Sequence, residues 1–357
     1  MKSFETALFL GALAFCWPFS LRAETLESSS SADLLGGLTG SSLSSAIDSF
    51  DIPEVRSSAE VEAGEAQQAT LGSGLKIYFV NVFQGDSEFI ELPNGKTVLI
   101  DAGPPPDPDS QYKTPIVSNF LTKHNVTKID YMVMTHPHAD HYGGMQWIFE
   151  NLQVDNFYDT RIDNSDADGD NMVRQQAKKE PGCAVHYPEE GDTLNWSDGV
   201  EVKVLNTCSK YDKSANHKPD TGAFLNKCSI VLKITYQHSS ALFEADAQSD
   251  VEARMVGKYG KDLKADILKV GHHGSAYSST EAFLKKVKPK LAYIEVGKYN
   301  DFGHPTKEAL SRLRAAGAKI HRTDKEGTIE HAMGKPSHNF EPLSLGPLFT
   351  SRPALQD

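Results

Sequence analysis

The feature that most constrains the fold is a set of metal-ligand side chains placed directly after an apolar run. Residues 131–134, Tyr-Met-Val-Met, are typical of a buried strand, and Thr-His-Pro-His-Ala-Asp-His follows at once. Imidazole and carboxylate are the ligands that zinc prefers, and a catalytic site uses about three protein ligands for each ion. Alternation along an extended chain puts His136 and His138 on one side. Asp140 and His141, at the turn into the next helix, can face a second ion, so the pattern predicts a two-metal centre at a strand end.

This motif and others along the chain resemble those of the metallo-β-lactamase superfamily. Upstream, Thr-Val-Leu-Ile-Asp-Ala-Gly at 97–103 resembles the family's strand that ends in an aspartate and a glycine. Downstream, Ala-Leu-Phe-Glu-Ala-Asp at 241–246 resembles the strand that delivers a bridging aspartate. The run Leu-Lys-Val-Gly-His-His-Gly-Ser at 268–275 stands where the last metal histidine belongs. The resemblance implies an α/β fold, a four-layer αββα sandwich with the metals at one sheet edge.

Within the superfamily, the motifs are most similar to those of the ComEC-type hydrolase domain of competence DNA-uptake proteins. The shared motifs include Val-Phe-Gln-Gly-Asp at 82–86, the His-His-Gly-Ser run and Gly-His-Pro at 303–305. The likeness covers about residues 75 to 333 and is weak between 155 and 225. Since this branch is associated with DNA degradation, the resemblance implies a phosphodiester substrate.

The resemblance also divides the ligands into two sets that share one aspartate. It assigns His136, His138 and one further ligand to metal one, Asp140, His141 and His272 to metal two, and Asp246 to the position between them. The cofactors would be two divalent ions, with zinc favoured and manganese as the alternative. Two ions that share a water lower its pKa enough to supply hydroxide as the nucleophile near neutral pH.

Several positions leave alternatives open. The third histidine that most of the superfamily supplies to metal one is absent, and Asn226 or Cys228 would stand in for it. Because adjacent strand residues point to opposite faces, only one of His272 and His273 is expected to reach the ion, and the other would act as a general acid or contact phosphate. His304 would donate to the substrate or cap the helix that follows. The candidate catalytic residues are Asp140, His273 and His304, and Asp101 is expected to orient the loop that carries His136.

Composition divides the chain into four segments. Residues 1–23 resemble a secretory signal peptide, because a lysine precedes an apolar run and Arg-Ala offers a cleavage point. Residues 24–74 are rich in Ser, Ala, Gly and Glu and predict a disordered linker or pro-segment. Residues 75–335 would form the hydrolase domain, and 336–357 an irregular tail. We therefore expect a secreted, periplasmic or extracellular protein with no membrane span once the signal is removed.

Strand-like and helix-like segments alternate through the predicted domain, as layered α/β folds require. A strand is expected at 75–83, and helices at 112–124, 141–152, 249–259 and 307–316, the last two followed by glycine. Export also bears on the cysteines Cys183, Cys208 and Cys228. Either Cys183 and Cys208 form a disulfide, or all three are buried thiols.

The charge balance limits the possible partners. A net charge of −12 argues against a broad basic surface for gripping nucleic acid, although it permits a nuclease whose metal ions hold the phosphate. The expected substrate is a small-molecule or nucleic-acid phosphodiester. The alternatives are a lactone, lactam or thioester hydrolase of the same fold, or a metal-binding relative without activity. The sequence leaves the oligomeric state open.

Overall fold

The computed structural model describes residues 74–334, except for positions 108, 110, 112 and 209–220. The predicted signal peptide at 1–23, the linker up to residue 73 and the tail at 336–357 lie outside the described residues. Within the described residues, no helix is long and apolar enough to cross a bilayer.

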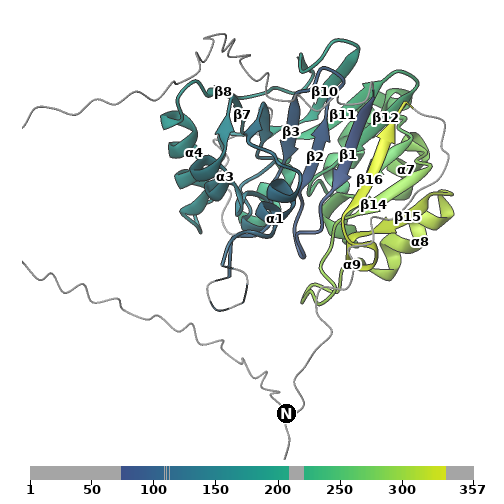
Figure 1. The fold of residues 1–357 in the computed structure, drawn as a ribbon. Coiled ribbons are helices and arrows are strands. Elements are labelled where there is room, and N and C mark those ends of the chain that lie inside the picture. The colour runs from purple at the N-terminus through teal and green to yellow at the C-terminus, as the bar shows by residue number, and fades with distance from the viewer. Residues whose placement is uncertain (1–73, 108, 110, 112, 209–220, 335–357) are drawn as a thin grey trace, which may run out of the picture. The chain divides into compact units, whose positions relative to one another are not determined.

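Two mixed β-sheets form the centre of the domain (Figure 1). The first sheet has the order β16 (Ile329–Met333), β1 (Leu75–Phe79), β2 (Glu88–Glu91), β3 (Thr97–Ile100), β5 (Tyr131–Val133), β7 (Asn156–Tyr158) and β8 (Ala184–His186). The second has the order β15 (Lys319–Arg322), β14 (Leu291–Ile294), β13 (Ile267–Lys269), β12 (Ser239–Phe243), β11 (Val231–Tyr236), β10 (Val200–Asn206) and β9 (Thr193–Leu194). A small parallel pair joins β4 (Lys128–Ile129) to β6 (Gln153–Val154).

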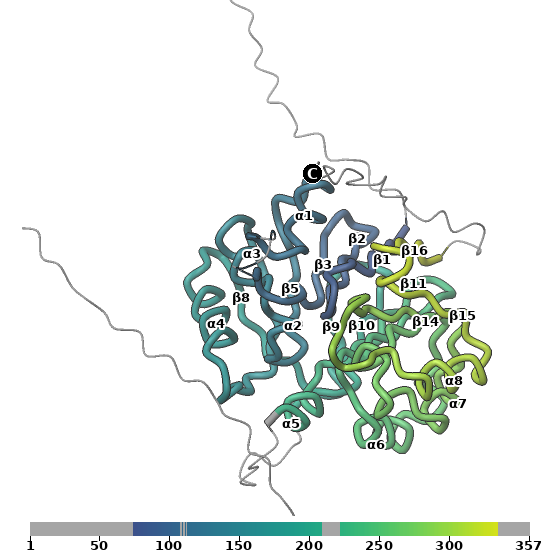
Figure 2. The backbone as a smooth tube through the Cα atoms, turned by 90° about the horizontal axis from the view of Figure 1, so that it is seen from below, coloured from purple at the N-terminus to yellow at the C-terminus, as the bar shows by residue number. Residues whose placement is uncertain are grey.

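Helices cover the outer faces of both sheets. The first sheet carries α1 (Ile116–Lys123), α2 (Ala139–Tyr142), α3 (Met145–Asn151) and α4 (Gly169–Lys179). The second carries α6 (Ser249–Tyr259), α7 (Glu281–Val287) and α8 (Lys307–Ala315), while α5 (Thr221–Lys227) and α9 (Thr323–Glu326) are short connections. Seen from below, α3 and α4 lie on the opposite side of the molecule from α6, α7 and α8 (Figure 2). The predicted αββα sandwich is therefore confirmed.

Strand alternation explains why one chain can fill three apolar layers. In β1, Leu75, Ile77 and Phe79 point into the cluster between the sheets, and Tyr78 points into the cluster under α1 and α3. A third cluster packs the second sheet against α6, α7 and α8. Between the sheets, the ring of Phe79 stacks on that of Tyr293 with centroids 4.0 Å apart. Because both rings are fully buried, this contact ties the two sheets together.

The predicted helix at 141–152 is wrong, because the structure has two helices there. Gly144 N–H donates to the carbonyl of Gly103, and the carbonyl of Asp140 accepts from Asp86 N–H, so the helical ladder is interrupted. A side chain at Gly143 would lie 2.0 Å from the backbone nitrogen of Pro105, which only glycine avoids. The break lets the loops that carry the metal motif pack against the rest of the first sheet.

Smaller differences follow from local chemistry. The predicted helix at 112–124 begins only at Ile116, because Pro115 is its extended N-cap. The first strand ends at Phe79 rather than at 83, since the chain then turns and Val80 N–H bonds to the carbonyl of Ser87. The predicted helix at 249–259 is confirmed with the same bounds.

Both expectations for the cysteines are wrong. Cys208 and Cys228 form a disulfide, with their Cα atoms 4.4 Å apart, and Cys183 is a free, half-buried thiol. The antiparallel pairing of β10 with β11 accounts for this partner. It aligns Asn206 with Val231, which brings together the two residues just beyond the strand ends.

We expect Phe79→Ala to lower the free energy of unfolding by about 3–5 kcal/mol, because it opens a cavity between two fully packed sheets. Urea denaturation of the full chain measures this. Met172→Ala, at a side chain that is 47% exposed on α4, is the control and should stay within about 0.5 kcal/mol. Equal losses in the two variants would contradict this account of the core.

The disulfide predicts a specific labelling pattern in protein produced in an oxidising compartment. Among Cys183, Cys208 and Cys228, only Cys183 should react with iodoacetamide in denaturant before reduction, and all three should react after it. Peptide mass spectrometry reads this out. Alkylation of Cys208 or Cys228 before reduction would refute the pairing.

Candidate metal centre

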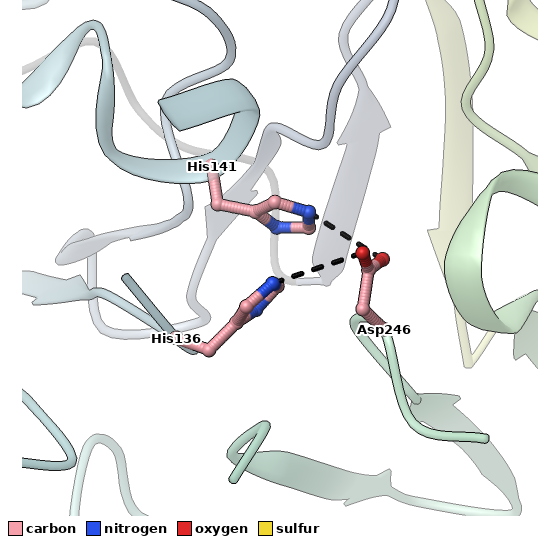
Figure 3. Close-up of side chains that lie close together, drawn as sticks. All are labelled: His136, His141 and Asp246. Carbon is pink, nitrogen blue, oxygen red and sulfur yellow. Dashed lines mark ion pairs between the residues drawn. The ribbon is translucent and has the colours of Figure 1, made fainter. Parts of the chain in front are cut away.

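The metal-ligand residues meet where strands of both sheets end. The motif at 135–141 follows β5 of the first sheet, Asp246 follows β12 of the second, and the histidine pair at 272–273 follows β13. Figure 3 shows His136 and His141 pointing at Asp246 from the opposite side of the site. Since β12 and β13 are parallel neighbours, their carboxyl ends deliver side chains to one place.

Two of the predicted metal-one ligands lie against each other. His136 Nε2 is 2.9 Å from His138 Nδ1 and 3.7 Å from Asp246 Oδ2. Two ring nitrogens this close can both direct their lone pairs at a single ion, which is how neighbouring histidines bind one metal.

A second group consists of Asp140, His141 and His273. His273 Nε2 lies 3.2 Å from Asp140 Oδ2, and His141 Nε2 lies 4.0 Å from Asp140 Oδ1. Asp246 faces both groups, since its Oδ1 is 3.4 Å from His141 Nε2 while its Oδ2 faces His136. This is the position that the sequence resemblance gave to a bridging carboxylate.

The alternation argument for the histidine pair is wrong. Strand β13 ends at Lys269, and both His272 and His273 adopt positive φ, 49° and 52°, in a tight turn. Both rings therefore reach the site. His273 joins Asp140 and His141, whereas His272 has Nε2 at 3.6 Å from Asp246 Oδ2 and Nδ1 at 3.0 Å from the Gln248 amide.

In His141 and His273, the ring nitrogen that points away from the site, Nδ1, has a hydrogen-bond partner. His141 Nδ1 is 2.7 Å from Asp101 Oδ2, and Asp101 also accepts from the backbone N–H and the hydroxyl of Thr135. His273 Nδ1 is 3.0 Å from the carbonyl of Glu295 and 3.1 Å from Asp86 Oδ1. Such partners set the tautomer and aim Nε2 at a metal.

The residues present fit a metal. His141 Nε2, His273 Nε2 and Asp246 Oδ1 are buried and have no hydrogen-bond partner. Buried polar atoms are almost always paired, so three that face one another indicate a cation between them. The donor set of imidazole and carboxylate is the one that zinc and manganese accept.

Charge explains why the site attracts cations. Burial and the neighbouring His141 hold the pKa of His136 well below its usual range, which keeps it in the neutral form that binds metal. Although burial opposes it, the carboxylates of Asp86 and Asp246 raise the pKa of His273 to about 10. Without a metal, these carboxylates thus draw a proton onto His273, and a metal would compete for the same nitrogen.

A buried acidic floor beneath the ligands was missed at the sequence level. Asp86, Glu88, Glu295 and Lys269 are all buried, and Lys269 Nζ pairs with the same Asp86 that faces His273. Burial and the charge of Asp86 raise the pKa of Glu295 to about 7. The available signal was a charged residue inside an apolar strand, as in Ile-Leu-Lys-Val and Tyr-Ile-Glu-Val.

The turn after α5 borders metal one where the third histidine is missing. Ile230 N–H donates to the carbonyl of Thr135, and Ser229 Oγ accepts from Asp246 N–H. Asn226, in the last turn of α5, has a buried Oδ1 without a hydrogen-bond partner. Cys228 is tied up in the disulfide, which leaves Asn226 as the candidate from this turn.

His304 lies beside the histidine pair and does not cap the next helix. Its ring centroid is 5.4 Å from that of His272 and 6.3 Å from that of His273. Thr306 caps α8 instead, since its side chain accepts from Ala309 N–H. Burial and the neighbouring His272 lower the pKa of His304 to about 4, so its ring is neutral at ordinary pH.

Lys269→Met should lower the free energy of unfolding by about 3–5 kcal/mol, because it leaves buried carboxylates without their cation. Adding Asp86→Asn to that variant should restore part of the loss. A double-mutant cycle in urea measures the coupling. Strictly additive losses would show that the two side chains do not act as a pair.

Comparison with known proteins agrees with this geometry. The sequence profile of the metallo-β-lactamase superfamily matches residues 80–208. The chain is 29% identical to ComE operon protein 3 of Bacillus subtilis over 272 residues, which cover 73% of this chain and 33% of that protein. It is 30% identical to competence protein ComA of Neisseria gonorrhoeae over 215 residues, 60% of this chain and 27% of the relative. The chain thus spans about a third or less of these relatives.

Among solved structures, the metallo-β-lactamase fold protein YhfI of Bacillus subtilis aligns with 72% of this chain and 99% of its own, at 11% identity and a TM-score of 0.48.

The two-sheet fold and the ligand motif at the strand ends agree with the match of residues 80–208 to the metallo-β-lactamase superfamily, a family of metal-dependent hydrolases.

Proposed function

We propose that the protein is an exported phosphodiester hydrolase that uses two divalent metal ions, zinc or manganese. The observation that carries the hydrolase chemistry is the pair of facing ligand groups with Asp246 between them. Phosphodiester as substrate is supported by the ComEC-type motifs and by the competence proteins among the relatives. Export is supported by the signal-like residues 1–23 and agrees with a disulfide in the domain.

The candidate ligands form two sets, one for each metal ion. His136 Nε2 and His138 Nδ1 would hold one ion, with Asn226 as a weaker third donor, and Asp140, His141 and His273 the other. Asp246 would contribute one oxygen to each. When bound, two such ions lower the pKa of a shared water and withdraw charge from a phosphoryl oxygen.

Other side chains would orient the metal ligands or donate hydrogen bonds to the substrate. Asp101 and the Glu295 carbonyl hold the Nδ1 atoms of His141 and His273, so that both Nε2 atoms stay aimed inward. His272 and His304 lie beside the ligands and would donate hydrogen bonds to the ester's oxygens. This exchanges the roles that the sequence gave to His272 and His273.

The first test is metal content and turnover of the full chain with bis-p-nitrophenyl phosphate under zinc or manganese. We expect turnover that EDTA abolishes and metal restores, and an Asp140→Ala, His141→Ala variant without either activity or the second ion. Bound metal together with cleavage of lactones or lactams, and none of the phosphodiester, would favour the alternative substrates. Absence of bound metal would favour a relative without activity.

A second test separates the two adjacent histidines. His273→Ala removes a proposed direct ligand of the second ion, so it should lose about one metal equivalent, and its affinity for that ion should fall by more than the roughly 10–100-fold that loss of an outer-shell partner costs. His272→Ala should keep the metal content of the parent while its turnover falls. Mass spectrometry for metals and chelator competition measure this. Loss of a metal equivalent in His272→Ala but not in His273→Ala would favour His272 as the ligand, as the sequence resemblance implied.

A further inference from the structure

The three most exposed large hydrophobic side chains of the described residues lie on the two loops that follow β13 and β14, at the sheet edge where the ligands lie. Tyr299, Phe302 and Tyr277 are 88%, 68% and 69% exposed. Tyr277 follows the histidine pair after β13, and the other two lie in the loop between β14 and α8. Because β13 and β14 are parallel neighbours, both loops leave the sheet at the edge where the ligands lie. We call these three residues the aromatic rim.

Ring contacts connect the rim to the ligands. Phe302 lies 5.8 Å from His304, with the rings only 26° from parallel. His304 in turn lies 5.4 Å from His272, whose Nε2 faces Asp246. A flat group stacked on Phe302 would therefore be separated from the metal ligands only by the rings of His304 and His272.

The rim loops are held rigid by hydrogen bonds. The Asn300 side chain donates to the carbonyls of Gly297 and His304 and accepts from His304 N–H. Gly297 N–H donates to Gln84 Oε1. On the other loop, the Arg312 guanidinium donates to the carbonyls of residues 276, 278 and 279. Rings shown to solvent on fixed loops bind a partner at little cost in conformational entropy.

Charge limits which partner fits. Lys298 is the cation nearest in sequence to the rim, with Nζ 5.1 Å from the Tyr299 ring, while Asp301 lies beside it in the same loop. With a net charge of −12, the protein has no excess of cations to neutralise many phosphates. Aromatic rings bind the faces of unpaired bases whatever their sequence, and duplex DNA does not offer those faces.

We propose that the aromatic rim stacks the bases of a single-stranded polynucleotide whose phosphodiester lies at the metal centre. This inference rests on the proposed function and adds its substrate class. Because stacking supplies the affinity, binding should depend only weakly on salt, unlike binding to a basic groove.

The test compares two ligands of equal charge on the full chain. Fluorescein-labelled oligothymidylate and an abasic oligomer with the same number of phosphates are titrated by anisotropy in EDTA, at low and high salt. The parent should prefer the thymidylate by about tenfold or more, and Tyr299→Ala, Phe302→Ala should bring the ratio close to one. Tyr299→Trp, Phe302→Trp should retain the preference, and Met172→Ala, at an exposed apolar residue outside the rim, should match the parent.

Each contrary outcome has a distinct meaning. Cleavage of bis-p-nitrophenyl phosphate by a parent that shows no preference for bases would overturn the rim inference and leave the proposed function standing. Rim-dependent binding without phosphodiester cleavage would overturn the proposed function, and with it the claim that the strand is a substrate. Loss of sedimentation with phosphatidylglycerol vesicles in the double alanine variant, with unchanged oligomer binding, would assign the rim to a membrane surface instead.

Discussion

The buried ion pair between Lys269 and Asp86 underlies the organisation of the site. Asp86 comes from the loop after β1 of the first sheet and Lys269 ends β13 of the second, so the pair joins the two halves below the ligands. The other oxygen of Asp86 lies beside His273, and the turn after Lys269 carries both histidines. A charge in a dry interior must be paired, which fixes the approach of the sheets at this point.

The two candidate ligand groups depend on that junction, because no single half of the domain completes them. His136, His138, Asp140 and His141 come from the first half of the chain, whereas Asp246 and His273 come from the second. Metal affinity therefore includes the free energy of bringing the halves together, as in other sites formed only on folding. The stacked rings of Phe79 and Tyr293 supply the apolar part of the same junction.

Local motifs carried the family resemblance that predicted the sandwich, which the structure confirms, and a ligand set whose side chains the structure brings close together. Ligands spaced within six residues, and short apolar runs bounded by turn residues, carry their information in neighbouring residues. What could not be predicted depends on the tertiary structure. The turn that lets both His272 and His273 reach the site begins where β13 ends, and the partner of Cys228 follows from the register of β10 and β11. The role of Lys269 depends on carboxylates up to 183 residues away.

The glycines around the metal motif have a consequence for how such a protein can change over evolution. A side chain at Gly85 would lie 2.3 Å from the carbonyl of Asp140, and one at Gly143 would meet Pro105, so neither glycine can be replaced without moving the backbone around the metal motif. By contrast, Tyr299 and Phe302, in the loop between β14 and α8, are 88% and 68% exposed, so their side chains can change without meeting the packed interior. New specificities can therefore arise by remodelling this outer loop while the chemistry beneath it is inherited unchanged.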